Sequence, residues 1–171
     1  MMFKIGKDIS KFSYCSCQPK TAKELKAIIN ARIVEEGPDC NLNDIDTSLI
    51  KDMGWLFDGS GFNGDISNWD TSRVKYMPYM FLNSDFNGDI SKWNISKVES
   101  MEGMFERSKF NGDISGWDVS NVKDMPYMFT LSSFNRDISN WNINKDCDVR
   151  SMFYSCPIKE EYKPKLLRCS I

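Results

Sequence analysis

The sequence predicts an α/β repeat solenoid, in which short units of the chain stack on one another between two caps. The first observation is a period of 24 residues, visible as four copies of an FNxDISxW…MF pattern without insertions. A fixed period of this length is typical of solenoids, whose units bury their apolar faces only against neighbouring units. A weaker copy over 42–57 brings the number of repeats to five. The second observation is a set of apolar columns at that period: Phe62, Phe86, Phe110 and Phe134; Ile66, Ile90, Ile114 and Ile138; Trp69, Trp93, Trp117 and Trp141; and Met-Phe pairs ending at Phe81, Phe105, Phe129 and Phe153.

Each repeat is expected to contribute one short strand and one short helical turn. Ile and Trp in the Asp-Ile-Ser-x-Trp stretch suit a pleated surface, and the Asn-Gly before it is a turn signal. Stacked repeats would therefore join short parallel strands on one wall. The VxxMxxMF stretch has apolar residues at i, i+3, i+6 and i+7, which favours a short helix or 3₁₀ turn on the opposite wall. Pro78 and Pro126 interrupt this stretch and limit it to about two turns.

The fifth repeat departs from the pattern at two positions. Arg136 replaces a glycine that the three preceding copies share, and Asp146 stands where they have valine. Either the coil loosens there, or Cys147 takes the apolar position by a shift of one residue. The pattern alone leaves both possibilities open.

Residues 1–37 predict an N-terminal segment that ends in a capping helix. Thr21, followed three residues later by Glu24, forms a capping box. Gly37, which precedes a proline, is a stop signal. We therefore expect an amphipathic helix from about 22 to 36 that covers the open end of the first repeat. Its apolar residues follow at helical spacing: Leu25, Ile28, Ile29 and Ile33.

The rest of the chain divides into the repeats and a second cap, within one structural domain. Residues 38–157 hold the five repeats, and residues 158–171 are expected to form the C-terminal cap. A solenoid needs such a cap because a bare terminal repeat exposes apolar core and strand edges. The residues expected to cover the last repeat are Ile158, Tyr162, Leu166 and Leu167.

The charge distribution favours a protein partner over a nucleic acid. Residues 1–37 carry seven Lys or Arg against four Asp or Glu, whereas residues 38–157 carry eleven against eighteen. An acidic repeat body disfavours direct binding to phosphates and is compatible with a partner that is itself basic or nucleic-acid-binding. No apolar run indicates a signal peptide or a membrane span, so we expect a cytoplasmic protein with reduced cysteines and no membrane contact.

The sequence lacks the residues that several kinds of catalysis and ligand binding require. The 171-residue sequence contains no histidine, which excludes Ser-His-Asp and Cys-His catalysis and every histidine-bearing metal site. It has no glycine-rich phosphate loop, since the glycines stand singly at repeat turns. No convergent acid–base set or nucleophile stands out. We therefore expect neither enzymatic activity nor a cofactor.

Two candidate metal sites were weighed, and neither is expected to bind metal. Cys15 and Cys17 with Cys40 could supply three zinc ligands, but Cys-x-Cys is a loose pattern and no fourth ligand is evident. A column of aspartates could form a calcium ladder, although its spacing matches no calcium-loop motif. Backbone N–H donors in each turn are the favoured partners of these carboxylates, which are Asp65, Asp89, Asp113 and Asp137.

The pattern FNxDISxWDxSxVxxMxxMF resembles the BspA-like branch of bacterial leucine-rich-repeat proteins, often described as mycoplasma-lipoprotein-type repeats. The lead-in KTAKELKAIINARIVEEGPDCNLNDIDTS and the closing CPIKEEYKPK share the resemblance, which covers about 19 to 165. It implies a leucine-rich-repeat-like solenoid with a binding role, commonly that of a surface adhesin. We see no secretion signal, lipid-attachment box or wall anchor, which disfavours an adhesin. Because the family is widespread in mobile and phage-borne genes, the resemblance also allows a protein that acts inside a bacterial or phage-infected cell.

The leading hypothesis is a non-enzymatic protein-binding module with an acidic solenoid surface. Its alternatives are a phage-type, anti-CRISPR-like inhibitor of a host defence or nucleic-acid-processing enzyme, and a bacterial surface adhesin. Columns that vary between repeats face solvent in a repeat protein, and exposed tyrosines are typical of interfaces. A second interpretation is that Tyr79 and Tyr127 only cover the short helix after each proline. The candidate partner-binding residues are Asp70, Asn94, Asp118, Asn142, Tyr76, Tyr79, Tyr127 and Lys92.

Overall fold

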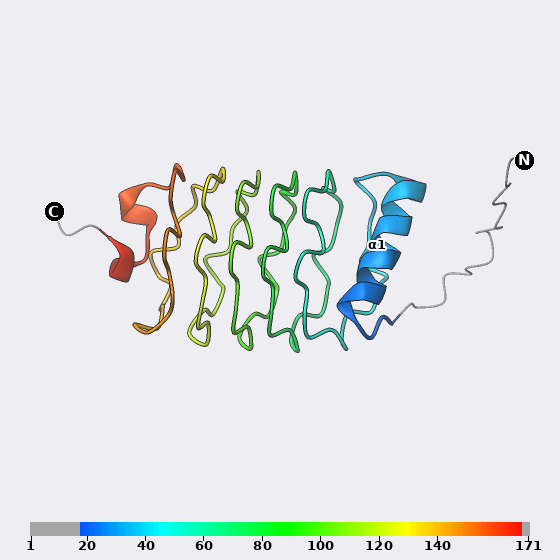
Figure 1. Ribbon diagram of the computed structural model, residues 1–171, viewed down its shortest axis with the longest axis horizontal. Coiled ribbons are helices and arrows are strands. Elements are labelled where there is room, and N and C mark those ends of the chain that lie inside the picture. Colours follow the sequence, from blue (N-terminus) through cyan, green and yellow to red (C-terminus); the bar gives the residue numbers. More distant parts are fainter. Residues whose placement is uncertain (1–17, 169–171) are drawn as a thin grey trace, which may run out of the picture.

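The computed structural model describes residues 18–168. Its α-helix in that range, α1, spans Ala22–Glu36, the residues over which the capping box and apolar spacing predict a helix. Thr21 Oγ1 accepts the N–H of Glu24 at 3.2 Å, which satisfies one of the donors left open at a helix start. Gly37, with φ of 94°, ends the helix and donates its N–H to the Ile33 carbonyl. The helix lies against the first coil of the chain (Figure 1) and buries Leu25 and Ile29 completely.

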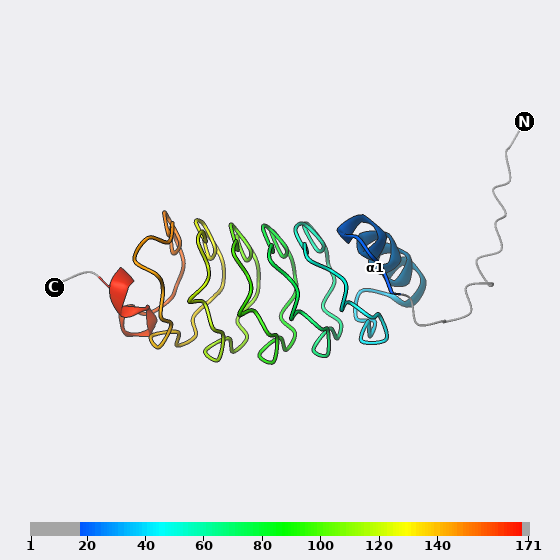
Figure 2. The ribbon, with the colours of Figure 1, turned by 90° about the horizontal axis from the view of Figure 1, so that it is seen from below.

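After α1 the chain winds into coils that stack side by side along the long axis of the molecule (Figures 1 and 2). We number them by sequence as coil 1 to coil 5: residues 38–61, 62–85, 86–109, 110–133 and 134–157. Equivalent residues of neighbouring coils are 24 apart, as in the parallel bridges that connect Asp52, Tyr76, Ser100, Asp124 and Asp148. Within residues 18–168 the bridges are isolated and form no longer strand. Two 3₁₀ helices follow the last coil, η2 (Glu160–Tyr162) and η3 (Lys165–Leu167).

The apolar columns form one continuous core inside the stack. The rings of Phe62, Phe86, Phe110 and Phe134 lie parallel, with centroids 6.0, 6.2 and 6.3 Å apart. A second phenylalanine column, from Phe57 to Phe153, has neighbouring centroids 5.3 to 5.7 Å apart. Burying a side chain of this size stabilises the fold by about 1.5–3 kcal/mol relative to leaving it exposed. The repeated columns therefore supply the packing that holds each coil to the next.

One wall of the stack carries most of the hydrogen bonds between coils. We call this wall the rung face and its segments rungs: 52–59, 76–83, 100–107, 124–131 and 148–155. Within each pair of neighbouring rungs, four N–H groups at alternate positions donate to carbonyls of the following coil. Between the second and third rungs these bonds join Met77 to Ser100, Tyr79 to Glu102, Phe81 to Met104 and Asn83 to Glu106, at 3.0, 2.7, 2.9 and 2.8 Å. The same four bonds recur between each of the remaining pairs of neighbouring rungs. The donor N–H groups of these bonds therefore all point toward the C-terminal end of the stack.

The rungs differ from the short helices that the VxxMxxMF pattern predicts. Residues 78–83 are turns, and two of them, Tyr79 and Asn83, have positive φ angles of 53° and 50°. The equivalent two positions have positive φ in every rung. Because alternate N–H groups bond to the next coil, they cannot make the internal bonds that a helix requires.

The Asp-Ile-Ser-x-Trp stretch also differs from the strand that its residue types predict. In the second coil, Asp65 Oδ1 accepts the N–H of Ser67 at 2.9 Å, which bends the chain into an Asx turn. Asp70 Oδ1 accepts the N–H of Ser72 in the same way, so this segment turns twice, as do the equivalent segments of the third and fourth coils. The carboxylate thus competes with the ladder that would form a strand. We call the surface built from these segments the Asx face: 63–72, 87–96, 111–120 and 135–144.

Each tryptophan joins two coils through its indole as well as its packing. Trp117 Nε1 donates to the carbonyl of Ile90, 27 residues earlier, at 3.2 Å. The same bond is made by Trp69, Trp93 and Trp141 to Leu42, Ile66 and Ile114. Only 4% of the Trp117 surface is exposed. The tryptophan column therefore satisfies a row of buried carbonyls in addition to filling the core.

The last coil and its cap resolve two open points of the sequence. Cys147 is buried and Asp146 is exposed, so Cys147 takes the apolar position by a one-residue shift. Its N–H donates to Asn144 O, as Val122 N–H donates to Val119 O in the preceding coil. The expected cap is only partly as predicted: Ile158 is buried, and Tyr162 and Leu167 pack against the core, but Leu166 is 54% exposed. Leu166 therefore does not cover the coil.

Candidate functional site

The rung face exposes most of the large apolar side chains found on the surface of the described residues. They are Trp55, Tyr76, Tyr127, Leu131 and Tyr154, with exposed fractions from 37% for Tyr127 to 65% for Tyr154. Tyr76 and Tyr127 are among the residues that the sequence proposes for partner binding. Trp55, Leu131 and Tyr154 are not, although the alignment of Trp55 with Tyr79 in the weaker first repeat was an available signal. Exposed aromatic side chains on one wall are typical of interaction surfaces.

Tyr79, which the sequence also proposes, lies differently from the other tyrosines. Its ring stacks on that of Trp55 with centroids 4.4 Å apart, and its hydroxyl donates to Glu102. Gly103 of the next coil makes room for it, because a Cβ there would come within 2.3 Å of the Tyr79 ring. Burial, and then the bond to Glu102, raises the pKa of Tyr79 well above its usual value. Tyr79 is therefore half-buried and fixed, and it presents a ring edge and the stacked Trp55 to solvent.

A line of charges at the coil period runs one position before three of the rungs. Glu99 lies between Lys75 and Lys123 of the neighbouring coils and forms ion pairs of 2.7 and 2.5 Å with them. Hydrogen bonds from Lys123 and Lys75 lower the pKa of Glu99 to about 2. Ser100 Oγ donates to Asp124 one column further along the rung. The contacts with Lys75 and Lys123 keep Glu99 ionised and hold it between the two neighbouring coils.

The other proposed residues lie on the Asx face. Asp70, Asn94 and Asp118 each accept the N–H of the serine two positions later through one side-chain oxygen, at 2.9, 3.2 and 3.1 Å. Bonds from these serines lower the pKa of Asp70 and Asp118, so both stay ionised. Asn142 is exposed in the last coil, and Lys92 is exposed near Asp89, whose pKa it helps to lower. Within residues 18–168 no hydrogen bond or ring contact joins this column to the tyrosines.

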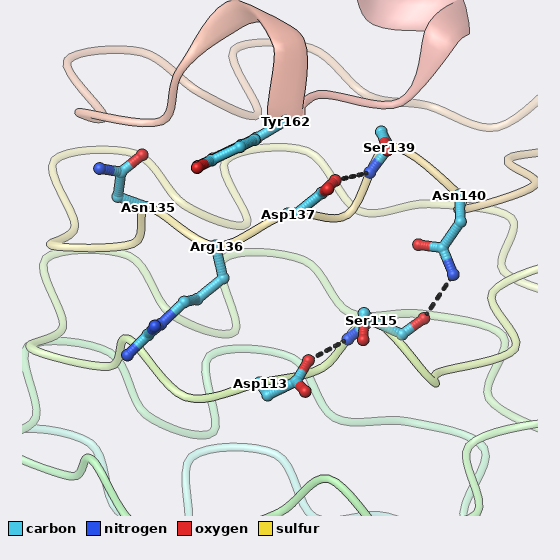
Figure 3. Close-up of a pocket in the computed structure, with 8 residues that line it drawn as sticks. All are labelled: Asp113, Ser115, Asn135, Arg136, Asp137, Ser139, Asn140 and Tyr162. Carbon is cyan, nitrogen blue, oxygen red and sulfur yellow. Dashed lines mark hydrogen bonds between the residues drawn. The ribbon is translucent and has the colours of Figure 1, made fainter.

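A polar cavity of about 460 Å³ lies at the C-terminal end of the Asx face, where Tyr162 of the cap overhangs coil 5 (Figure 3). The carboxylates of Asp113 and Asp137 face it from neighbouring coils. Arg136, which replaces the glycine of the preceding coils, donates through Nε to the Asn111 carbonyl at 2.8 Å. Asn140 Nδ2 donates to the Ser115 carbonyl at 2.9 Å. The cavity therefore arises where the repeat pattern is broken.

The carboxylates of this cavity are poor candidates for acid–base catalysis. Each accepts the N–H of the serine two positions later at 2.9 Å, Asp113 from Ser115 and Asp137 from Ser139. These bonds lower the pKa of both carboxyl groups. A general acid needs a pKa near the working pH, which requires a shift in the opposite direction. The cavity is thus a polar recess with fixed hydrogen-bonding groups.

The candidate metal ligands stand apart where the structure describes them. Cys15 and Cys17 lie outside the described residues. Cys40 is buried, and burial is the main cause that raises the pKa of its thiol. Over 18–168 no group of three or more Cys, Asp or Glu side chains is arranged to hold a metal ion. In the aspartate column, Asp89 accepts the N–H of Ser91 at 2.9 Å, which is the backbone contact favoured from sequence.

The chain thus consists of stacked 24-residue coils around a buried aromatic core, which is the architecture of a repeat protein. The chain belongs to the family described as Mycoplasma protein of unknown function, DUF285, which matches it over residues 29–130 and again over 101–159. No curated protein and no solved structure matches the chain. In the described part of the chain, no helix is both long and apolar enough to cross a membrane.

Proposed function

We propose that the protein is a non-enzymatic protein-binding module, built as a leucine-rich-repeat-like solenoid of the BspA-like type. The observation that carries this proposal is the set of exposed apolar side chains on the rung face. Tyrosine and tryptophan dominate the energetics of protein interfaces because they bury a large area and keep a polar tip. The rungs that present them are fixed by four hydrogen bonds to each neighbouring coil. A rigid surface of this kind loses little conformational entropy when a partner binds.

The charges on both faces favour a basic partner. On the rung face, Glu102 and Glu106 lie beside the Tyr79 position, and on the Asx face Asp70 and Asp118 are held ionised. Fixed carboxylates attract Lys- and Arg-rich surfaces and speed their association, in a way that weakens as salt increases. A basic or nucleic-acid-binding protein therefore fits the surface better than a nucleic acid does.

We place this interaction in the cytoplasm. The thiols of Cys40, Cys147 and Cys156 are free, and Cys40 and Cys147 are buried in the core. Free thiols that pack as small apolar groups suit a reducing compartment.

The test begins with affinity capture by the tagged protein, after which the dominant retained protein is purified and its Kd is measured by calorimetry. Tyr127→Ala is expected to weaken binding about thirtyfold, which corresponds to about 2 kcal/mol for an interface hot spot. Val34→Ala is the matched control, because Val34 is an apolar side chain of α1 with 88% exposure and lies outside the rung face. We expect its Kd to stay within about twofold of the unaltered protein's.

Charge reversal provides the second arm of this test. Asp118→Lys is expected to slow association at low salt and to reduce the dependence of Kd on salt. A partner whose Kd is the same for the unaltered protein, Tyr127→Ala and Asp118→Lys would refute binding through these surfaces. A catalysed change in the purified partner would refute the non-enzymatic assignment.

A further inference from the structure

The rung hydrogen bonds have a direction, and this direction leaves the last rung incomplete. Between coils 4 and 5, the N–H groups of Met125, Tyr127, Phe129 and Leu131 donate to Asp148, Arg150, Met152 and Tyr154 at 2.8, 3.0, 2.9 and 2.9 Å. The equivalent donors of coil 5 point toward the C-terminal end, where residues 18–168 supply no further coil. Within residues 18–168 no acceptor contacts these four N–H groups, which belong to Val149, Ser151, Phe153 and Ser155. We call them the rung edge.

The C-terminal cap leaves the rung edge open because it pairs with the other side of coil 5. Tyr162 O accepts the N–H of Ile138 at 3.0 Å, and Asn135 Oδ1 accepts the N–H of Lys159 at 3.1 Å. In Figure 2 the cap correspondingly lies against one half of the last coil. Two of the most exposed apolar side chains of the described residues, Tyr154 at 65% and Leu166 at 54%, belong to this end of the molecule. The edge thus combines unpaired backbone donors with apolar surface.

A second copy of the protein fits this edge poorly. Two rung edges placed against each other would set N–H groups against N–H groups. Head-to-tail stacking would require the outward carbonyls of the first rung, at 52–58, but α1 packs over that end of the stack. Its Leu25 and Ile29 are fully buried there, and Lys26 Nζ donates to the carbonyl of Trp55. Residues 18–168 therefore offer no complementary edge, and we assign it to another chain.

We propose that the rung edge binds a segment of a partner protein by backbone pairing, with the segment folded as a rung and its alternate carbonyls accepting the four N–H groups. Coil 5 shows the required geometry, since its own rung fills the same place on coil 4. Adding an extended segment to an open edge gives affinity through main-chain bonds, and side chains beside the edge give selectivity. Tyr154, which is 65% exposed, provides an apolar contact for the segment. This inference goes beyond the proposed function, because it assigns a second surface, whose use does not depend on the rung face.

The first experiment measures amide hydrogen exchange in the full protein. In the free protein, the N–H groups of Ser151 and Phe153 should exchange at least about tenfold faster than those of Tyr127 and Phe129, which are bonded to the next coil. The probe is a synthetic peptide with the sequence of 121–133, because its rung has the pattern that the edge would accept. At saturation it should slow exchange at the rung edge by at least about tenfold, and a scrambled peptide should not. Slow exchange in the free protein, or no protection by the peptide, would overturn the proposal.

A backbone variant then tests the donors themselves. The protein is assembled by ligation at Cys147, with an ester in place of the amide N–H of Ser151. Loss of one of four donors should weaken peptide binding about fivefold to tenfold. The matched control is an ester at Lys165, whose N–H also lacks an acceptor within residues 18–168 but lies in η3. Equal peptide affinity for the two esters would show that the peptide binds elsewhere. Tyr127→Ala should leave peptide binding unchanged, because Tyr127 belongs to the rung face. The peptide experiments therefore test the rung edge independently of the binding proposed for the rung face.

Discussion

Replacing Trp117 by phenylalanine tests how the tryptophan column holds neighbouring coils together. Trp117 is 4% exposed, and its indole N–H donates to the carbonyl of Ile90 at 3.2 Å. That carbonyl also accepts the backbone N–H of Trp93, so it keeps one bond when the indole is removed. The substitution therefore removes one bond between coils without leaving the carbonyl wholly unpaired.

Two terms set the expected loss of stability. A net intramolecular hydrogen bond contributes about 0.5–1.5 kcal/mol. The smaller phenylalanine also loses roughly 40 Å² of buried apolar area, or about 1 kcal/mol at 25 cal/mol per Å². We expect Trp117→Phe to cost about 1.5–3 kcal/mol, and Trp117→Ala about 3–5 kcal/mol because it leaves a larger cavity.

Thermal unfolding followed by circular dichroism measures this loss. In a domain of this size 1 kcal/mol shifts Tm by about 2–4 °C, so Trp117→Phe should lower Tm by about 3–12 °C. Trp55→Phe is the control, because Trp55 is 44% exposed and a phenylalanine can still stack on Tyr79. Its cost should stay within about 0.5 kcal/mol. Equal costs for the two substitutions would refute the idea that the indole bond ties the coils.

Three further changes probe the turns, the charges and the capping helix. Gly103→Ala should cost about 1–3 kcal/mol in urea unfolding, because Gly103 has φ of 55° and a Cβ would strike the Tyr79 ring, whereas Gly116→Ala, with open space around it, should be neutral or slightly stabilising. The pKa of Glu99 is lowered from 4.5 to about 2, so its stabilising contribution is complete above about pH 5 and is lost as the pH falls toward 2. The difference in urea midpoint between the unaltered protein and Glu99→Gln should shrink over that range, and a constant difference would contradict the ion-pair assignment. Thr21→Ala should cost about 1 kcal/mol in urea unfolding through loss of the helix cap.

The sequence predicts best the features that local chemistry decides. The capping box at Thr21 and the glycine at Gly37 place α1 to the residue, because both act on backbone groups next to them in the chain. The core columns are equally predictable, since apolar residues that recur at the period of 24 stack on one another in neighbouring coils and are buried together. All members of the Phe62 column, for example, are fully buried.

The rungs could not be predicted because their bonds join residues 23 positions apart. In a sequence, glycine is the usual sign of a residue with positive φ, but here Tyr79, Arg107 and Leu131 adopt that backbone conformation. Their strain is offset by the hydrogen bonds and packing of neighbouring coils, which no single repeat shows. The strand expected at Asp65 failed for a related reason, because the side chain bonds locally to Ser67 and turns the chain.

Seven of the eight proposed binding residues are exposed and Tyr79 is half-buried, but the sequence could not show which of them lie together. Asp70 and Asp118 belong to the Asx face, whereas Tyr76 and Tyr127 belong to the rung face. Separation along one repeat does not give the angle at which the chain turns between them. Tyr154 was missed because its column holds aspartate, leucine, glutamate and threonine in the other coils, so no repeat pattern marked it.

The direction of the rung bonds makes the two ends of the stack chemically different, and this has a consequence for added repeats. A further copy of residues 110–133, inserted after residue 133, would add four rung bonds and one more set of buried columns, and stability should rise because each added repeat packs against its neighbours. The last rung would still be 148–155 of the original sequence, with the same four unpaired N–H groups. Peptide affinity at the rung edge should therefore be the same with five or six repeats. A partner that spans the rung face should bind the two proteins differently, because the insertion increases the distance between Tyr127 and Tyr154 and leaves that between Trp55 and Tyr127 unchanged. Calorimetry on the two proteins distinguishes these outcomes, and a change in peptide affinity would mean that the peptide binds along the face.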